Sequence, residues 1–173
     1  MIKRRSNIVL TGFMGTGKST VGKIIAAKLG YEFVDTDESI AIVHGPIPKF
    51  FEENGEPAFR KLEREISDVL SKRSRLVIST GGGLMLDADC AAFLEPVSEV
   101  FCLSASASEI LKRVNGNGQA GARPLLEGDN AAIRITHLLE ERSKGYGRYR
   151  EVPTDYLSPR DVADAVIAQL ASN

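Results

Sequence analysis

The residues best suited to chemistry lie close together near the start of the chain, in GFMGTGKST at positions 12–20. The segment matches the phosphate-binding pattern G-x4-G-K-S in full, with an apolar run before it and an amphipathic run after it. In such a loop the backbone N–H groups face phosphate oxygens, Lys18 reaches the β- and γ-phosphates, and the Ser19 hydroxyl binds Mg²⁺. We therefore expect a nucleoside triphosphate, most simply ATP, held with Mg²⁺ by Gly15, Thr16, Gly17, Lys18, Ser19 and Thr20.

This loop occurs in GTPases, motors, ATPases and small kinases, and a kinase also needs an acceptor site and a group that handles the acceptor proton. No Asn-Lys-x-Asp run that would read guanine is present. Asp35 and Asp37 follow the second apolar run and are the candidate proton-handling groups. One of the two can face the metal while the other faces an acceptor hydroxyl. The alternative is a helix N-cap, since Asp37 precedes Glu38, Ser39 and Ile40.

Three further segments carry candidate substrate-binding residues. In GEPAFRKLE, at 55–63, Glu63 stands three residues after Arg60 on a predicted helix and can orient it, unless the two form a solvated charge pair. The glycine triplet 81–83 follows a predicted strand and lets the backbone approach a substrate. The glycine-rich stretch 115–128 has no period and holds one arginine, Arg123, so it reads as a lid or as a solvated loop.

Alternating apolar and amphipathic runs must position these residues. We expect strands at 8–10, 33–35, 75–79 and 97–103, helices at 18–29, 56–70, 107–114, 131–142 and 159–170, and an extended piece at 154–157. This alternation predicts an α/β fold with a mostly parallel sheet covered on both faces. Right-handed crossovers bring the carboxyl ends of the strands to one edge, where ligands bind in such folds.

Composition restricts the function classes. A length of 173 residues fits one domain, 1–173, and a net charge of -1 argues against binding nucleic acid through bulk electrostatics. No apolar stretch approaches the roughly 20 residues that span a bilayer, so we expect no membrane partner. Cys90 and Cys102 show no metal or redox spacing and are expected to be buried thiols, with the cytoplasm as the default location.

The motifs GFMGTGKST, Asp35-x-Asp37, GEPAFRKLE, STGGG and ARPLL follow one another in this order. With this order and spacing, essentially the whole chain resembles the shikimate kinases. The resemblance implies a three-layer P-loop kinase fold, with a central parallel five-stranded sheet flanked by helices, a substrate-binding segment at about 35–63 and a lid at about 115–128. It also implies transfer of the ATP γ-phosphate to the 3-hydroxyl of shikimate, giving shikimate 3-phosphate and ADP in the route to chorismate and the aromatic amino acids.

Other readings are a kinase for another small hydroxy acid such as gluconate, or a non-catalytic ATP-binding module. An acceptor panel would separate the two kinases. The non-catalytic reading is disfavoured because Asp37, Arg60 and Arg123 are all present. The resemblance further implies ATP and shikimate as small-molecule partners, Mg²⁺ as the cofactor and a monomer.

The resemblance also assigns roles by position. Asp37 is the candidate base and contacts the ring hydroxyls, Asp35 binds Mg²⁺ through water, and Arg123 closes on the phosphates. The remaining shikimate contacts it implies are Arg60, Arg142, Gly81, Gly82, Gly83, Phe51, Phe59 and Glu63, and the adenine contacts are Arg113 and Pro159. At the position of Arg142 the family usually has the sequence R-x-P-x-Y, whereas this chain has RSKGY, with Lys144 in place of the proline. A second alignment, shifted toward Tyr149, is therefore also possible.

Overall fold

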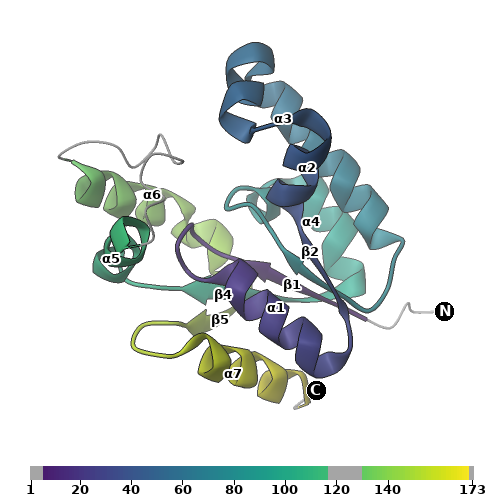
Figure 1. The fold of residues 1–173 in the computed structure, drawn as a ribbon, viewed down its shortest axis with the longest axis vertical. Helices are drawn as coiled ribbons and strands as arrows, with labels where there is room; N and C mark the ends of the chain where they lie inside the picture. Colours follow the sequence, from purple (N-terminus) through teal and green to yellow (C-terminus); the bar gives the residue numbers. More distant parts are fainter. Residues whose placement is uncertain (1–5, 117–129, 172–173) are drawn as a thin grey trace.

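The computed structural model describes residues 6–116 and 130–171, which form one five-stranded parallel sheet with helices on both faces (Figure 1). The strand order is β2-β3-β1-β4-β5. The strands are β1 (Asn7–Thr11), β2 (Glu32–Asp35), β3 (Leu76–Ser79), β4 (Ser98–Ser104) and β5 (Arg150–Pro153). The α/β, three-layer prediction with a central parallel five-stranded sheet is confirmed.

The central strands are apolar because both faces of the sheet are covered. In β1, Ile8 and Leu10 pack toward one layer and Val9 toward the other, and all three are buried.

The extended piece expected at 154–157 is wrong, because the last strand, β5, lies four residues earlier, at 150–153. Only Val152 is buried in that edge strand, and a single inward side chain gives too weak an alternation to mark a strand.

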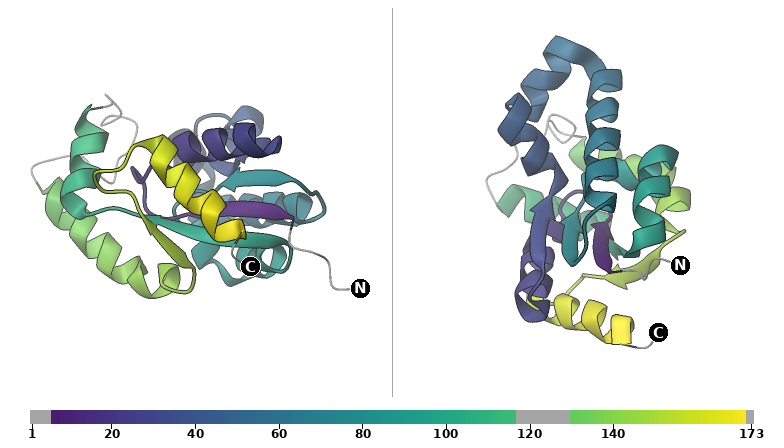
Figure 2. Two further views of the ribbon diagram at one scale, coloured as in Figure 1. Left: turned by 90° about the horizontal axis from the view of Figure 1, so that it is seen from below. Right: turned by 90° about the vertical axis from the view of Figure 1, so that its right-hand side faces the viewer.

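The helices divide between the two faces of the sheet (Figures 1 and 2). One layer is formed by α1 and α7, whose apolar residues pack on one face, and the other by α3 and α4. The pair α5 and α6 packs beside the carboxyl edge of β4. The helices are α1 (Lys18–Leu29), α2 (Thr36–His44), α3 (Ile47–Ser71), α4 (Ala88–Leu94), α5 (Ala107–Gly116), α6 (Ala131–Tyr146) and α7 (Pro159–Ala171), with short 3-10 turns η1 (Leu84–Leu86) and η2 (Glu95–Val97).

Helix α2 corrects the prediction for the two aspartates. It begins at Thr36, directly after β2, and Asp35 is its N-cap, accepting from the backbone N–H groups of Asp37 and Glu38 at 3.1 and 3.2 Å. Asp37 therefore lies in the first helical turn and not on an extended segment. The N-cap reading applies to Asp35, because an aspartate followed by two acidic residues complements a helix N-terminus.

Helix α3 is broken at Gly55, whose φ of 78° and ψ of 169° are not helical. The helix predicted to begin at 56 is the part after this break, and the part before it, 47–54, was missed. Pro57 follows in the first turn of the second part, where proline is tolerated. Together, α2 and the first part of α3 project beyond the carboxyl edge of the sheet (Figure 1).

The two cysteines are buried, as expected: Cys90 is 0% exposed and Cys102 is 4% exposed. Burial raises the pKa of both thiols to about 11, so both stay protonated at neutral pH.

Within the described parts of the chain, no helix combines the length and apolar character needed to cross a membrane.

Asp87 links the start of α4 to α3. Its carboxylate caps α4 by accepting from the N–H groups of Asp89 and Cys90, and Arg64 donates to it at 2.7 Å. The arginine and the two N–H groups lower the pKa of Asp87 from 3.8 to about 2 despite partial burial. Because the folded pKa is the lower one, this stabilisation is full above about pH 4 and is lost as the pH falls through 2.

Asp87→Asn keeps an equally good N-cap but loses the charge, and because Arg64 is exposed to solvent we expect it to lower the free energy of unfolding by only about 1 kcal/mol at pH 7. Asp87→Ala loses the cap too and is expected to cost about 1 kcal/mol more. Urea unfolding at several pH values measures both. The deficit of Asp87→Asn against the parent must shrink between pH 4 and pH 2, and a deficit that does not change with pH would contradict this account.

Candidate active site

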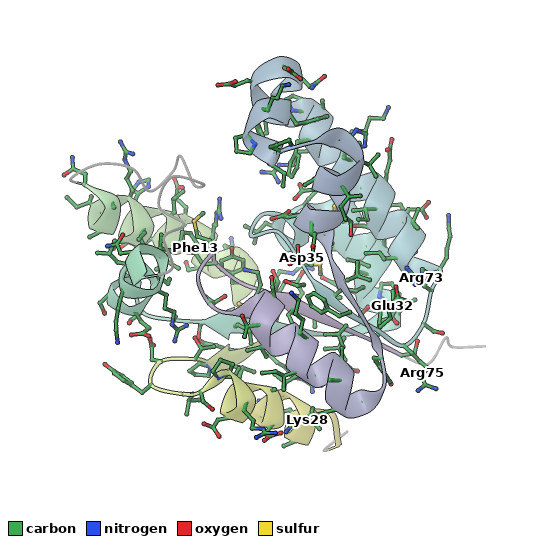
Figure 3. All side chains as sticks on the ribbon, in the orientation of Figure 1. Phe13, Lys28, Glu32, Asp35, Arg73 and Arg75 are labelled. Carbon is green, nitrogen blue, oxygen red and sulfur yellow. The ribbon has the colours of Figure 1, made fainter. Side chains whose placement is uncertain are left out.

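Strand register brings the predicted site together at one edge of the sheet. Asp35 at the end of β2 pairs with Ser79 of β3, and Ser79 pairs with Leu10 of β1. The phosphate-binding loop, Asp35 and the glycine triplet therefore leave the sheet side by side. At the other end of β2, Glu32 pairs with Arg73 at 2.5 Å, far from this edge (Figure 3).

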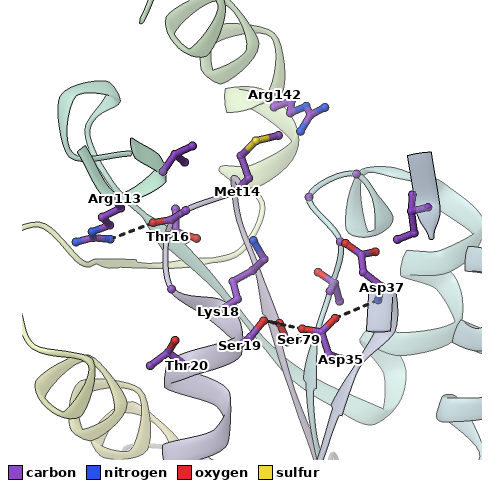
Figure 4. Close-up of a pocket in the computed structure, with 18 of the residues that line it drawn as sticks. Met14, Thr16, Lys18, Ser19, Thr20, Asp35, Asp37, Ser79, Arg113 and Arg142 are labelled. Carbon is purple, nitrogen blue, oxygen red and sulfur yellow. Dashed lines mark hydrogen bonds between the residues drawn. The ribbon is translucent and has the colours of Figure 1, made fainter. Parts of the chain in front are cut away.

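A cavity of about 1250 Å³ opens at this edge (Figure 4). It exceeds the roughly 300–1,000 Å³ usual for one small ligand and so has room for two. Its lining includes the loop, α2 and α3 residues, and parts of α5, α6 and α7. Of the predicted site residues, it contains Gly15, Thr16, Gly17, Lys18, Ser19, Thr20, Asp35, Asp37, Phe51, Phe59, Arg60, Glu63, Gly81, Gly82, Gly83, Arg113, Arg142 and Pro159.

The phosphate-binding loop depends on glycine at its first position. Gly12 has φ of +130°, and a Cβ there would lie 2.2 Å from the carbonyl oxygen of Leu103. Lys18 donates from Nζ to the carbonyls of Gly12 and Phe13 at 2.8 and 2.9 Å. The lysine thus folds back over its own loop, at the start of α1, where the helix dipole adds positive potential.

Ser19 and Asp35 form the oxygen-rich side of the cavity. The Ser19 hydroxyl donates to Asp35 Oδ2 at 2.6 Å and lies 3.2 Å from the Ser79 hydroxyl (Figure 4). Mg²⁺ prefers oxygen ligands, keeps several waters and takes only one or two groups from a protein when phosphates are present. The donor set here fits that preference.

Asp37 lies against the glycine triplet. A Cβ built on Gly81 would be 2.5 Å from Asp37 Oδ1, so the carboxylate occupies the space that a side chain would fill. The Gly81 N–H donates to the Thr36 hydroxyl at 3.1 Å, which fixes the triplet to the start of α2. Position 81 requires glycine because a Cβ there would collide with the Asp37 carboxylate, and not because its backbone angles exclude other residues.

Gly81→Ala is expected to push the Asp37 carboxylate aside and lower kcat by about 10²-fold, since misplacing a reacting group by about 1 Å costs this much. Steady-state kinetics measures the effect. Gly116→Ala is the matched control, because a Cβ there meets nothing within 4 Å. Unchanged kcat in Gly81→Ala, with the fold intact, would show that the position of Asp37 does not limit turnover.

Arg60 is held by two glutamates. Its Nη1 donates to Glu63 at 2.5 Å, and its Nη2 and Nε donate to Glu56 at 2.9 and 3.3 Å. Glu63 is 1% exposed, and burial raises the pKa of its carboxyl while the Arg60 hydrogen bond opposes that rise. The predicted orienting role of Glu63 agrees with this geometry, whereas the contact with Glu56 was not foreseen. A Cβ on Gly83 would lie 2.9 Å from Arg60 Nη1.

Arg142 faces the same cavity from α6 (Figure 4). Its guanidinium lies 5.5 Å from the centre of the Phe13 ring and beside Tyr146, whose hydroxyl donates to the Gly82 carbonyl at 2.7 Å. Arg148 and Arg150 instead pair with Glu95 and Glu99 away from the cavity. The unshifted alignment, with Arg142 as the second arginine, is therefore the one that the geometry supports.

Two phenylalanines, one from each part of α3, form an apolar wall of the cavity. Phe51 and Phe59 lie with ring centroids 4.7 Å apart, and Phe59 is only 5% exposed. Both line the cavity, as predicted. Such a wall suits the non-polar face of a small ring.

Arg113 marks the end of the cavity where a nucleotide base is expected. Its guanidinium donates to Glu109, to the Gly15 carbonyl and to both the hydroxyl and the carbonyl of Thr154. It is therefore not a solvated arginine, since it ties the phosphate-binding loop to the segment before α7. Pro159 lines the cavity nearby.

The predicted lid, at about 115–128, lies mostly outside the residues that the structure describes. Asn115 and Gly116 end α5, which corrects the start of the predicted lid. Residues 117–128, including Arg123, lie outside the part of the chain that the structure describes, so their assignment stays a prediction.

Four contributors to the site were missed from sequence. Thr36 and Tyr146 fix the glycine triplet, Thr154 holds Arg113, and Glu56 pairs with Arg60. Two of them carry a usable signal, because Glu56 and Arg60, like Arg142 and Tyr146, stand four residues apart on one helix face. The threonines act through contacts that no local pattern encodes.

Comparisons with known proteins agree with this geometry. The family model described as shikimate kinase matches residues 14–171. A shikimate kinase of Thermodesulfovibrio yellowstonii is 41% identical over 165 residues, covering 94% of each chain, and one of Caldicellulosiruptor bescii is 40% identical over 164 residues, also covering 94% of each chain.

Solved structures give the same picture. The shikimate kinase of Acinetobacter baumannii, in complex with shikimate, superposes with a TM-score of 0.90 at 34% identity, covering 99% of this chain and 96% of its own. A gluconokinase of Sinorhizobium meliloti reaches a TM-score of 0.64 at 22% identity, covering 98% of this chain and 96% of its own, which is a likeness of fold alone. The match over nearly the whole length means that this chain belongs to the shikimate kinase family.

Proposed function

We propose that this protein transfers the γ-phosphate of ATP to the 3-hydroxyl of shikimate, giving shikimate 3-phosphate and ADP. The observation that carries the proposal is a shared cavity. Lys18 and Ser19, Asp37, and the arginines Arg60 and Arg142 all line it, so a triphosphate and a carboxylate-bearing acceptor fit in one space. Guanidinium groups match a carboxylate in planar, paired hydrogen bonds, which suits the acid group of shikimate.

In the proposed reaction each of these groups has one role. Asp37 accepts the proton of the 3-hydroxyl as that oxygen forms its bond to the γ-phosphorus. The bond between the γ-phosphorus and the bridging oxygen breaks, and ADP leaves. Lys18 leaves the carbonyls of its own loop for the β- and γ-phosphates and offsets the negative charge on the transferring group.

The oxygen-rich side of the cavity supports a Mg²⁺ proposal. Ser19 would hold the ion directly, and Asp35, already bonded to Ser19, would hold it through water. Bound there, the ion would supply positive charge that offsets the charge on the transferring phosphoryl group. For Arg123 the proposal rests on the sequence resemblance alone, as a cation that closes over the phosphates and helps to exclude water.

From the family resemblance we further propose that residues 1–173 form one domain and act as a monomer. ADP release in the presence of Mg²⁺ tests the main proposal, with shikimate, gluconate and AMP as separate acceptors. We expect strong stimulation by shikimate alone. Stimulation by gluconate instead would indicate a kinase for another hydroxy acid. No stimulation by any of the three acceptors would contradict the proposed kinase activity.

A further inference from the structure

The two arginines that face the acceptor side of the cavity differ in their charge environment. Arg60 already has two carboxylates, Glu63 on Nη1 and Glu56 on Nη2 and Nε. Within the described residues, Arg142 has no ion pair and contacts Phe13 and Tyr146 instead. An incoming acceptor carboxylate therefore finds a positive charge ready at Arg142 and a neutralised one at Arg60.

The two glutamates on Arg60 are not equivalent. The Glu63 side chain is 2% exposed, whereas that of Glu56 is 63% exposed and lines the cavity. A buried carboxylate that loses its arginine pays a large desolvation cost, but an exposed one returns to water at little cost. Glu63 is thus the fixed partner of Arg60, and Glu56 is the exchangeable one.

Glu56 also stands at a point where the backbone allows it to leave. It is the first residue after Gly55, where α3 is broken, so its side chain projects from the free start of the second helical part. The guanidinium edge that it occupies, Nε together with Nη2, is the edge that pairs with a carboxylate through two parallel hydrogen bonds.

We propose that Glu56 is an internal competitor for the acceptor's carboxylate, and that it occupies Arg60 in the free protein and must be displaced when a carboxylate-bearing acceptor binds. This inference rests on the proposed function and adds a specificity-determining residue to it. A carboxylate acceptor replaces one anion on Arg60 by another. A neutral acceptor of the same shape has no carboxylate to pair with the guanidinium, so Glu56 stays in place. Glu56 therefore lowers affinity for the carboxylate acceptor and leaves affinity for a neutral analogue almost unchanged.

Glu56→Gln tests this, because glutamine keeps the shape of the side chain and removes its charge. Calorimetric titration of the full chain with shikimate is expected to give about two- to fivefold tighter binding than the parent, the range set by a single exposed ion pair. Titration with the methyl ester of shikimate, which lacks the charge, is expected to give the same affinity in both proteins. Glu53→Gln is the matched control, since Glu53 is 60% exposed, pairs with Lys49 at 3.7 Å on the same helix, and is absent from the cavity lining.

The sign of the change decides between two roles for Glu56. Weaker shikimate binding in Glu56→Gln would mean that Glu56 orients Arg60 and does not compete, which overturns the inference. Equal tightening with Glu53→Gln, or with the ester, would overturn it as well, since the effect would then be a general one of charge. If the parent binds no shikimate, the proposed function is wrong. If the parent binds shikimate and Glu56→Gln binds it no more tightly, the proposed function stands and only the inference about Glu56 is wrong.

Discussion

Asp37→Asn is expected to lower kcat by about 10²- to 10⁴-fold while the affinity for ADP stays unchanged. Asparagine has the same shape but cannot accept a proton from a hydroxyl, and a positioned general base contributes a factor of this size. The carboxylate of Asp37 lies against Gly81 at the acceptor side, and the Lys18–Ser19 segment lies on the other side of the cavity (Figure 4). Loss of the base should therefore affect the chemical step and spare nucleotide binding.

Steady-state kinetics and an ADP titration measure the two quantities separately. Glu38→Gln is the control, because Glu38 is exposed, stands in the same first turn of α2 and is absent from the cavity lining. Equal turnover in Asp37→Asn and the parent would remove Asp37 from the chemistry. A matching loss in Glu38→Gln would show that the charge of the helix start, and not the base, is responsible.

Lys18→Met is expected to lower kcat/KM for ATP by about 10²- to 10³-fold, the usual result of deleting one preorganised charge aimed at the reacting group. Methionine keeps the length of the side chain and removes the ammonium that must move from the Gly12 and Phe13 carbonyls to the phosphates. The loop itself is fixed by Gly12 and by the Thr16 hydroxyl, which donates to the Phe13 carbonyl at 2.8 Å, so it should keep its shape.

Lys23→Met on the exposed side of α1 removes the same charge away from the cavity and serves as the control. Initial rates over a range of ATP concentrations give kcat/KM for both variants. A fall of less than about tenfold in Lys18→Met would contradict a direct role for this lysine at the transferred phosphate.

Local signals made the sheet and the phosphate-binding end predictable. The run Ile8 to Leu10, the glycine loop and α1 occur without interruption, and the observed helix has the predicted bounds, Lys18–Leu29. The structure of this segment is determined by residues a few positions apart in the sequence, through glycine backbone angles, the apolar stripe of the helix and the residues at the helix start. The parallel order then followed from alternation of strands and helices.

The acceptor side was predictable only in part, because its contacts join distant segments. The sequence left open whether the aspartates lie on an extended segment or at a helix start, and the structure places Asp37 in the first turn of α2. The approach of Asp37 to Gly81 spans 44 positions and leaves no periodic pattern in the sequence. The choice between Arg142 and the arginines near Tyr149 likewise needed the fold, since only the position on α6 shows which side chain faces the cavity.

Transfer of the phosphate to one particular hydroxyl is tested by locating the phosphate in the product. The purified protein is incubated with ATP, Mg²⁺ and shikimate, and phosphorus and proton NMR locate the new ester. We expect one product, phosphorylated at the 3-hydroxyl, in an amount equal to the ADP formed. Inorganic phosphate as the main product, or an ester at another hydroxyl, would contradict the placement of Asp37 as the base.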